Sequence, residues 1–398
     1  MSPRPHGQLR RSQVITTFGP GALLDLPDYS VIVGGLEHWE QRGPEILEER
    51  LLGKLREQLN NPRLQLFSPP TDTNEPGAER TGIKAWEFPE WFVAQRDLPG
   101  GPTRSRPLVH ARRLVRGKYQ DDEGKRWDVQ PVRWVQACER GHIDEIDWIG
   151  FVHEDPNTRC RRELFLEEHG TTGDLSEISV RCACTKRQYL VRATIRSEMR
   201  LGYCGGRRPW LGNNSRERCG GSEGKPLPNR FLLRSASNAY FPVSLSAISL
   251  PETDEAIRRA VDRVWEDFLQ FTKSLERLEE ERERPKVKAA LGDLPTEAVW
   301  KEVRRRHQGD AVQTKGIKSA ELETLLAQPE GLVDEIPETT FFARRLPASS
   351  TPQVPGIDRV VLVHRLREVV AQVGFTRFES SQPDVEGELA LGVQLARL

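Results

Sequence analysis

The six cysteines of this 398-residue chain all lie between positions 138 and 219, and this confinement constrains the fold more than any other feature. The first residues, MSPRPHGQLRRSQ, lack the apolar stretch of a secretion signal, so we expect a cytoplasmic protein. Cytoplasmic proteins rarely keep structural disulfides, and grouped thiols there indicate metal binding or redox chemistry. A thioredoxin-like pair has two residues between its cysteines, whereas Cys182 and Cys184 have one. The pattern therefore favours a metal.

Zinc takes about four nitrogen or sulfur ligands in a tetrahedral array, and a short cysteine knuckle supplies two of them from one turn. Cys182 and Cys184 form such a knuckle. Cys204 and Cys219 are each followed by two glycines, which let the backbone turn so that its amides face a thiolate. The sequence predicts one structural zinc site made by Cys182, Cys184, Cys204 and Cys219.

Cys138 and Cys160 remain outside that arrangement. His142 follows Cys138 by four residues, and His153 lies between Cys138 and Cys160. A second site could use Cys138, His142 and Cys160, or these residues could complete the first site in another pairing. The simpler alternative is that several of the six thiols are buried side chains, because free cysteine packs as a small hydrophobe. No H-E-x-x-H pattern is present, which favours structural over catalytic zinc.

Basic residues gather before and within the cysteine window. Lys+Arg and Asp+Glu both number 59, so the chain is not basic as a whole, although a local DNA-binding face is compatible with this balance. Such residues would contact phosphates and position the DNA rather than read its bases. They could equally be solvated faces or protein contacts. The candidates are Arg104, Arg106, Arg112, Arg113, Arg116, Lys118, Arg207 and Arg208.

No catalytic residue is predicted. The stretch GGSEGKP, at 220–226, resembles part of a phosphate-binding loop but lacks its first glycine and ends in proline. An alternative from another class is a metal-dependent nuclease that uses His142, Asp144 and Asp147. A solvated turn explains the same carboxylates more simply.

The chain as a whole predicts an α+β protein with several domains. Its segments are an N-terminal α+β region (1–120), a zinc-ribbon-like cysteine module (121–250), a helical insertion (251–335) and a C-terminal α/β fragment (336–398). In the third segment, Ile257, Val261 and Val264 recur at helical spacing. No apolar run approaches the roughly 18 residues that would cross a membrane, so we expect no membrane partner.

Several sequence blocks together resemble the DrmB family, the helicase-associated subunit of the DISARM antiphage defence system. They appear in the family's order and reach across most of the chain. The blocks are RRSQVITTFGPGALLDL with GLEHWE, CERGHIDEIDW, YCGGRRPWL, SASNAYFPVSLSAISLP and VHRLREVVAQVGFTRF.

The resemblance implies a non-catalytic partner of a DrmA-like helicase ATPase that helps the pair bind foreign DNA. It also implies structural metal ligation by the four cysteines named first. Two departures accompany it. Ala94 and Asp97 stand where relatives carry a C-x-x-C knuckle after the FPEWF phrase, which implies that Cys138 and Cys160 are stranded.

The second departure concerns the C-terminal domain, which ends at Leu398, earlier than the family pattern. We expect either a shortened domain or a second polypeptide that completes it, because a sheet without its last strands exposes an edge that a partner must cover. The remaining alternative for the whole chain is a purely structural interaction subunit without DNA contact.

Overall fold

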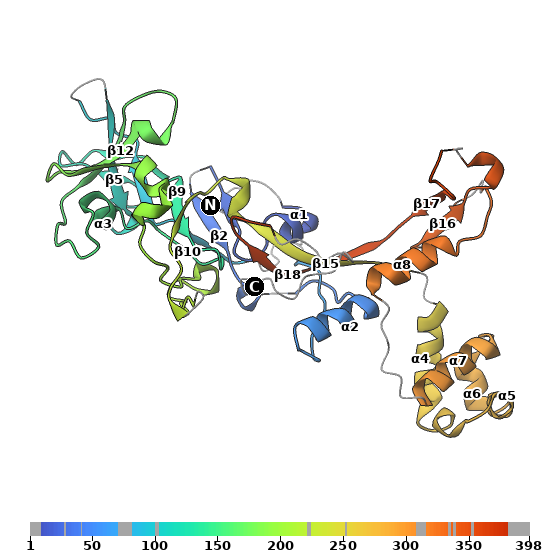
Figure 1. The fold of residues 1–398 in the computed structure, drawn as a ribbon. Coiled ribbons are helices and arrows are strands. Elements are labelled where there is room, and N and C mark those ends of the chain that lie inside the picture. The colour runs from blue at the N-terminus through green and yellow to red at the C-terminus, as the bar shows by residue number, and fades with distance from the viewer. Residues whose placement is uncertain are drawn as a thin grey trace. The chain divides into compact units, whose positions relative to one another are not determined.

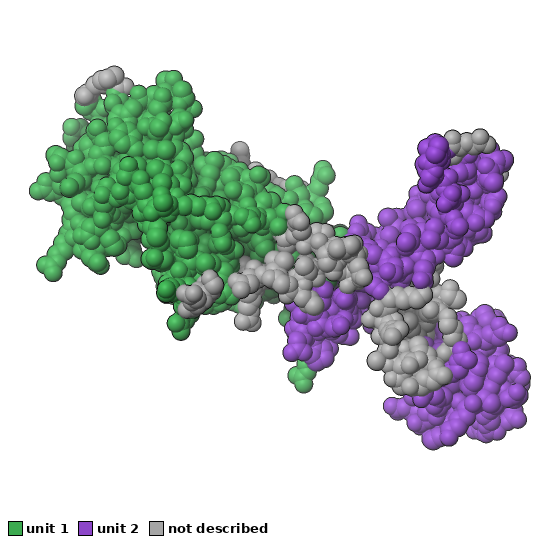
Figure 2. Space-filling view, viewed as in Figure 1, with its two compact units in different colours: residues 1–47, 63–245, 370–398 green, residues 48–62, 246–369 purple. Residues whose placement is uncertain are grey.

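The computed structural model describes most of the chain, apart from both ends and several internal gaps. The described residues are 9–27, 29–40, 42–70, 82–99, 103–220, 224–250, 253–307, 316–332, 336, 340–351 and 354–380. Helices and strands both occur throughout, which confirms the α+β class (Figure 1). The chain forms two compact units, coloured in Figure 2: residues 1–47, 63–245 and 370–398, and residues 48–62 and 246–369.

The first unit contains a six-stranded antiparallel sheet in the order β13-β12-β11-β5-β4-β8. Its strands are β4 (Trp91–Ala94), β5 (Arg104–His110), β8 (Val129–Pro131), β11 (Leu164–Glu168), β12 (Ile178–Cys182) and β13 (Arg187–Tyr189). Strands on both sides of residue 120 thus share one sheet. The predicted four-segment division stays a prediction.

One face of this sheet carries the main core, because alternate residues of a strand point to the same side. Ile178, Val180 and Cys182 of β12 are buried and share that face. Helix α3 (Trp148–His153) packs against β12 and β13 through Trp148 and Phe151. The C-terminal end of α3 therefore lies close to the thiols at the end of β12.

Two three-stranded antiparallel sheets, β10-β9-β14 and β1-β2-β3, accompany it. Their strands are β1 (Leu23–Asp25), β2 (Ser30–Val33), β3 (Ala85–Glu87), β9 (Trp134–Ala137), β10 (Ile143–Asp144) and β14 (Arg230–Leu233). Three two-stranded pairs complete the sheets: β6 (Tyr119–Gln120) with β7 (Arg126–Trp127), β15 (Phe241–Ile248) with β18 (Glu368–Thr376), and β16 (Phe342–Arg345) with β17 (Val361–Arg365). All four residues of β2 are buried.

The second unit holds most of the helices. Its described helices are α2 (Glu49–Gln58), α4 (Thr253–Trp265), α5 (Leu275–Arg282), α6 (Pro285–Leu291), α7 (Thr296–His307) and α8 (Ile317–Leu326). The first unit contains α1 (Arg11–Thr16) and α3. Ile257, Val261 and Val264 of α4 are buried against α6 and α7, as their helical spacing predicts. Within the described residues, no helix has the length and apolar character needed to cross a membrane.

The C-terminal segment predicted for 336–398 is described only in part. The described part contains β16, β17 and β18. The terminal stretch 381–398, on which the expectation of a shortened domain depends, lies outside the described residues.

Candidate metal centres

The six cysteines and two histidines form two separate four-residue clusters. Site A consists of Cys138, His142, Cys204 and Cys219, all buried. Site B consists of His153, Cys160, Cys182 and Cys184, of which Cys182 is fully buried and the others are partly buried. Within each cluster the four ligand atoms lie within 4.8 Å of one another. Both are thus three-thiol, one-imidazole sets.

Site A is built on the β9–β10 hairpin. Cys138 follows β9 and His142 precedes β10, and the amide of Cys138 donates to the carbonyl of His142 at 3.0 Å. The two residues are therefore opposite each other, which places the His142 Nδ1 atom 3.3 Å from the Cys138 Sγ atom. Gly141 closes the turn at a φ of 82°, in the left-handed region that favours glycine.

Two loops bring the remaining thiols of site A. The Cys204 Sγ atom lies 3.5 Å from His142 Nδ1, and the Cys219 Sγ atom lies 4.0 Å from that of Cys138. The amide of Gly206 donates to the Cys204 sulfur at 3.3 Å, as predicted for the glycines beside a ligand. Gly206 has a φ of 68°, and a Cβ there would meet the Glu217 carbonyl oxygen at 1.7 Å, so only glycine fits.

A carboxylate orients the imidazole of site A. The Nε2 atom of His142 lies 2.6 Å from Glu217 Oε1, and Arg208 donates to the other oxygen of Glu217 at 2.7 Å. Since Nε2 donates to Glu217, the Nδ1 lone pair is left facing the thiols. A carboxylate behind a ligating histidine is the usual support of a metal site, because it fixes the tautomer and the ring orientation.

Site B is assembled where α3 meets the β12–β13 turn. His153 ends α3, Cys182 ends β12, and Cys184 lies in the turn. His153 Nε2 is 3.2 Å from Cys184 Sγ, and the sulfurs of Cys160 and Cys182 are 3.6 Å apart. His153 Nδ1 is 2.7 Å from the Ile149 carbonyl oxygen. Donation to that carbonyl leaves the Nε2 lone pair facing the sulfurs, as in site A.

The spacing of the ligand atoms fits zinc rather than disulfides. Zinc ligands at about 2.0–2.3 Å from a tetrahedral centre are separated from one another by roughly 3.5–3.8 Å. The measured contacts run from 3.2 to 4.0 Å. All six cysteines are free thiols, and the sulfur pairs are far from the about 2.05 Å of a disulfide.

In each site one thiol has a lowered pKa and another has a raised pKa. In site A, a hydrogen bond from Cys204 and the nearby His142 lower the pKa of Cys138 to about 4, while the contact with Cys138 and burial raise the pKa of Cys204. In site B, the amide of Lys186 and the Cys182 thiol lower the pKa of Cys184 to about 6, while burial raises the pKa of Cys182 to about 11. A divalent cation would favour ionisation of the remaining thiols.

The structure corrects the predicted ligand sets. Cys182 and Cys184 lie in site B and Cys204 and Cys219 in site A, so the structure does not bring the four together. Nor do the members of the possible second set, Cys138, His142 and Cys160, share a site.

Cys138 and Cys160 are not stranded, since each joins a cluster. The predicted grouping of the cysteines was wrong because strand register and helix packing, rather than proximity in the sequence, determine which thiols lie together. His153 was noted between Cys138 and Cys160 but was not grouped with Cys182 and Cys184, although its position at the end of an apolar helix seven residues before Cys160 was a usable signal.

The predicted nuclease residues do not converge. The His142 ring faces the thiols of site A, Asp144 pairs with Arg207 at 2.8 Å, and Asp147 caps α3 by accepting from the Gly150 amide at 3.0 Å. Three separate structural contacts thus occupy the residues of that alternative.

The predicted DNA-contact residues divide into three groups. Arg207 and Arg208 are partners of Asp144 and Glu217 beside site A, and their charges are engaged there. Arg104 and Arg106 lie on β5 and pair with Glu168. The third group is exposed on the loop after β5, which we call the basic loop: Arg112, Arg113, Arg116 and Lys118. Arg113 pairs with Glu163 at 2.9 Å and Lys118 with Asp128 at 2.7 Å.

A third cluster, Glu90, His110 and Glu145, also has the composition of a metal site. The His110 Nδ1 atom accepts a hydrogen bond from the Arg112 amide at 3.2 Å, so the proton is on Nε2, which lies 3.5 Å from the Glu90 carboxylate. Glu145 accepts from the Glu90 amide. Because these groups bond to one another, no nitrogen lone pair is left for a cation.

Glu145 is expected to make stability depend on pH. Burial raises the pKa of its carboxyl to about 7, against 4.5 ordinarily, so the folded state holds this proton more tightly than the unfolded state. That contribution is complete below pH 4.5 and is lost as the pH rises through 7. Urea unfolding of the chain and of Glu145→Gln at pH 5 and pH 8 should show the variant gaining on the order of 2 kcal/mol relative to wild type. An equal difference at both pH values would contradict this.

Comparison with known proteins shows that both sites lie within the part of the chain that matches a protein-family model. A family model described as "Domain of unknown function (DUF8724)" matches residues 10–241, more than half of the chain. The chain is also 26% identical over 270 residues to the DISARM protein DrmB of Bacillus paralicheniformis. That alignment covers 64% of this chain and 45% of the relative, so the chain spans about half of the relative's length. The resemblance to DrmB stated from the sequence blocks is confirmed.

Proposed function

The chain belongs to the DUF8724 family, and from this premise, together with its similarity to DrmB, we propose that it is a non-catalytic subunit of a DISARM-type antiphage defence complex in the cytoplasm. Its role is to dock on a DrmA-like helicase ATPase and to help that enzyme hold foreign DNA. The similarity to DrmB carries this proposal.

Zinc at sites A and B has a structural role in this proposal. Three thiols and one imidazole form a closed set that leaves no position for a substrate, as in structural rather than catalytic zinc centres. Site A ties the β9–β10 hairpin to two long loops, and site B ties α3 to the β12–β13 turn. The loops that carry Cys204 and Cys219 and the turn that carries Cys184 lie outside strands and helices, so metal ligation would supply much of the free energy that holds them.

The basic loop is our candidate for contact with DNA. Arg112 and Arg116 are exposed and form no salt bridge within the described part of the chain, so their charges are available to phosphates. Phosphate contacts of this kind release counterions, which makes affinity fall steeply with salt. They would position the DNA without reading its sequence.

Charge reversal tests this role. The triple variant Arg112→Glu, Arg113→Glu, Arg116→Glu is expected to weaken DNA binding by the full chain and its helicase partner and to reduce the slope of log Kd against log salt by about 3. Fluorescence anisotropy with single-stranded and duplex oligonucleotides measures both quantities. The matched control reverses three exposed arginines of the β17 region, Arg359, Arg365 and Arg367.

Copurification separates the two parts of the proposal. If the chain binds the helicase but the triple variant leaves DNA affinity unchanged, the basic loop has no part in DNA binding. If the complex gains no DNA affinity from the chain at all, the chain is an interaction subunit without DNA contact. Failure to bind the helicase would overturn the docking role.

A further inference from the structure

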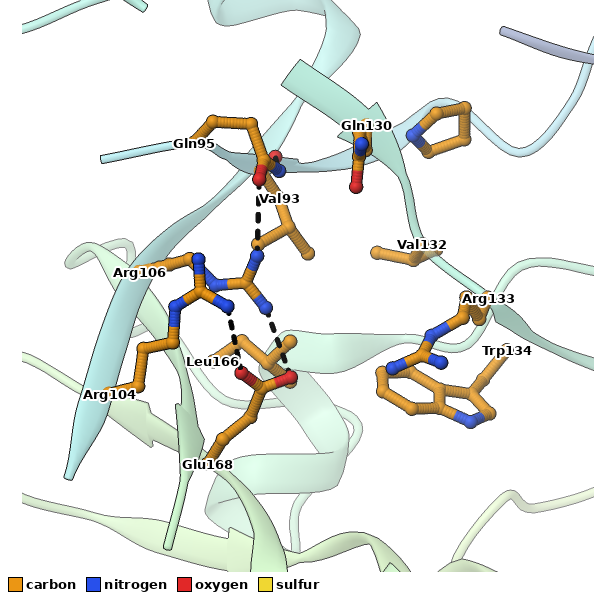
Figure 3. A pocket seen from close by; sticks show the side chains of 11 residues that line it. Val93, Gln95, Arg104, Arg106, Gln130, Val132, Arg133, Trp134, Leu166 and Glu168 are labelled. Carbon is orange, nitrogen blue, oxygen red and sulfur yellow. Dashed lines mark hydrogen bonds and ion pairs between the residues drawn. The ribbon is translucent and has the colours of Figure 1, made fainter. Parts of the chain in front are cut away.

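A cavity of about 340 Å³ opens on the six-stranded sheet, and none of its lining residues belongs to site A or site B (Figure 3). Strands β4, β5, β8 and β11 and the start of β9 supply its walls. It is lined by Val93, Gln95, Arg104, Arg106, Gln130, Pro131, Val132, Arg133, Trp134, Leu166 and Glu168. Its volume is that of a small-molecule site, which ordinarily begins near 300 Å³.

The charge of the lining is positive. Arg104 and Arg106 share a single carboxylate, Glu168, at 3.8 and 3.0 Å. Arg133 is exposed and makes no salt bridge within the described residues, so three guanidinium groups face one lining carboxylate. Asp97 pairs with Arg104 at 2.7 Å but is not part of the lining. An anionic guest would balance the excess.

Arg106 is the feature that marks a built site. Its side chain is only 9% exposed, and its terminal nitrogens donate to Glu168 at 3.0 Å and to Gln95 at 3.3 Å. The Nε atom is buried without a hydrogen-bond partner. Burial of a guanidinium is costly, and an unpaired donor adds to that cost. A fixed, incompletely satisfied cation in a cavity is the arrangement that binds an anion.

The rest of the lining suits a flat, partly apolar group. Val93, Val132 and Leu166 form the apolar wall, and the Arg133 guanidinium lies over the Trp134 ring at 5.4 Å from its centroid. Figure 3 shows Gln95 and Gln130 near each other on the rim. Gln95 is held by Arg106 and by the Val93 carbonyl, whereas the exposed Gln130 offers an amide donor and acceptor. Phosphate, ring and hydrogen-bonding edge thus each have a counterpart.

We propose that this cavity seats one unstacked nucleotide of single-stranded DNA, with its phosphate near the arginines and its base against the apolar wall. The proposal rests on the DNA-binding role proposed above and deepens it. A single nucleotide enters such a cavity readily from a single strand, whereas a base in a duplex would first have to leave its stack and its pair. The cavity therefore favours single strands, which the phosphate contacts of the basic loop alone would not.

The test compares Arg106→Gln and Arg133→Gln in the zinc-loaded full chain, with exposed Arg365→Gln as the matched control. Fluorescence anisotropy is measured with a single-stranded oligothymidylate of twelve nucleotides and with a duplex of equal length. Each cavity variant is expected to weaken single-strand binding roughly tenfold and to leave duplex binding unchanged. Arg133→Gln removes an exposed side chain, so its result does not depend on tolerance of a core change.

Other outcomes overturn the proposal in distinguishable ways. If the variants weaken single-strand and duplex binding equally, the cavity arginines attract DNA only through their general positive charge. If neither binding is weakened, these arginines have no part in DNA binding. If wild type binds neither DNA, the DNA-binding role fails, and calorimetry with thymidine monophosphate decides the cavity alone. Binding of that nucleotide, lost in both variants, would keep the cavity as a free-nucleotide site, and no binding would reject it.

Discussion

The purified chain is expected to contain two zinc ions per molecule, and Cys138→Ser is expected to reduce this to one. Serine cannot supply a thiolate, and Cys138 contacts both His142 and Cys219 within site A. Because the metal joins the β9–β10 hairpin to two loops, its loss should also lower the midpoint of thermal unfolding by about 10 °C or more. Elemental analysis and differential scanning calorimetry measure the two effects.

Cys182→Ser is the matched variant for site B and should also leave one zinc per chain. Under the predicted arrangement Cys138 is stranded and Cys138→Ser would leave the zinc content unchanged, so this single variant distinguishes the two pairings. The double variant lacks one ligand in each site. It should contain no zinc. If the single variants do not fold, Glu217→Gln weakens only the support of His142 and should reduce zinc affinity at site A by roughly 10- to 100-fold. Freshly prepared wild type without zinc would reject both sites.

Arg377→Met is expected to destabilise the chain by about 3–5 kcal/mol, the cost of breaking a buried charged network. Arg377 is 1% exposed, and its guanidinium donates to three backbone carbonyls: Gly21, Gly141 and Ala239. Methionine fills similar space but leaves three buried acceptors without donors, each of which costs about 1–3 kcal/mol. Urea unfolding at fixed pH measures the loss.

Two comparisons make the Arg377 result specific. Arg365→Met removes an exposed arginine from β17 and should change stability by less than about 0.5 kcal/mol. The zinc content of Arg377→Met should stay at two per chain. Arg377 donates to the backbone of the Gly141 turn, and its hydrogen bonds do not involve the side chain of any zinc ligand. A variant as stable as wild type would show that water can replace the guanidinium.

Arg377 also illustrates the limit of prediction from sequence. In the block GFTRF, an arginine after an apolar strand is typical of a solvated strand end. The structure instead buries it, with its guanidinium 4.9 Å from the centroid of the Phe375 ring. Burial is tolerable only because carbonyls from three distant segments converge on it, and no local pattern indicates that convergence.

Local chemistry was predictable from the sequence alone. The confinement of the thiols indicated the window that contains both candidate metal clusters, the glycines after Cys204 indicated amide contact with sulfur, and the spacing of Ile257, Val261 and Val264 predicted α4. The last two of these depend on residues a few positions apart. Backbone geometry at that range is determined by the residues themselves.

Which thiols share a site was decided by the tertiary structure. Leu164 pairs with Cys182 across β11 and β12, and α3 packs on that sheet so that His153 reaches Cys184. Cys138 meets Cys219 only because a loop 81 residues further along the chain returns to the β9–β10 hairpin. Ligand type is a property of each residue, whereas ligand pairing follows from strand register and core packing over long sequence distances. The sequence by itself therefore determined the chemistry of the window, and the fold determined its division into two centres.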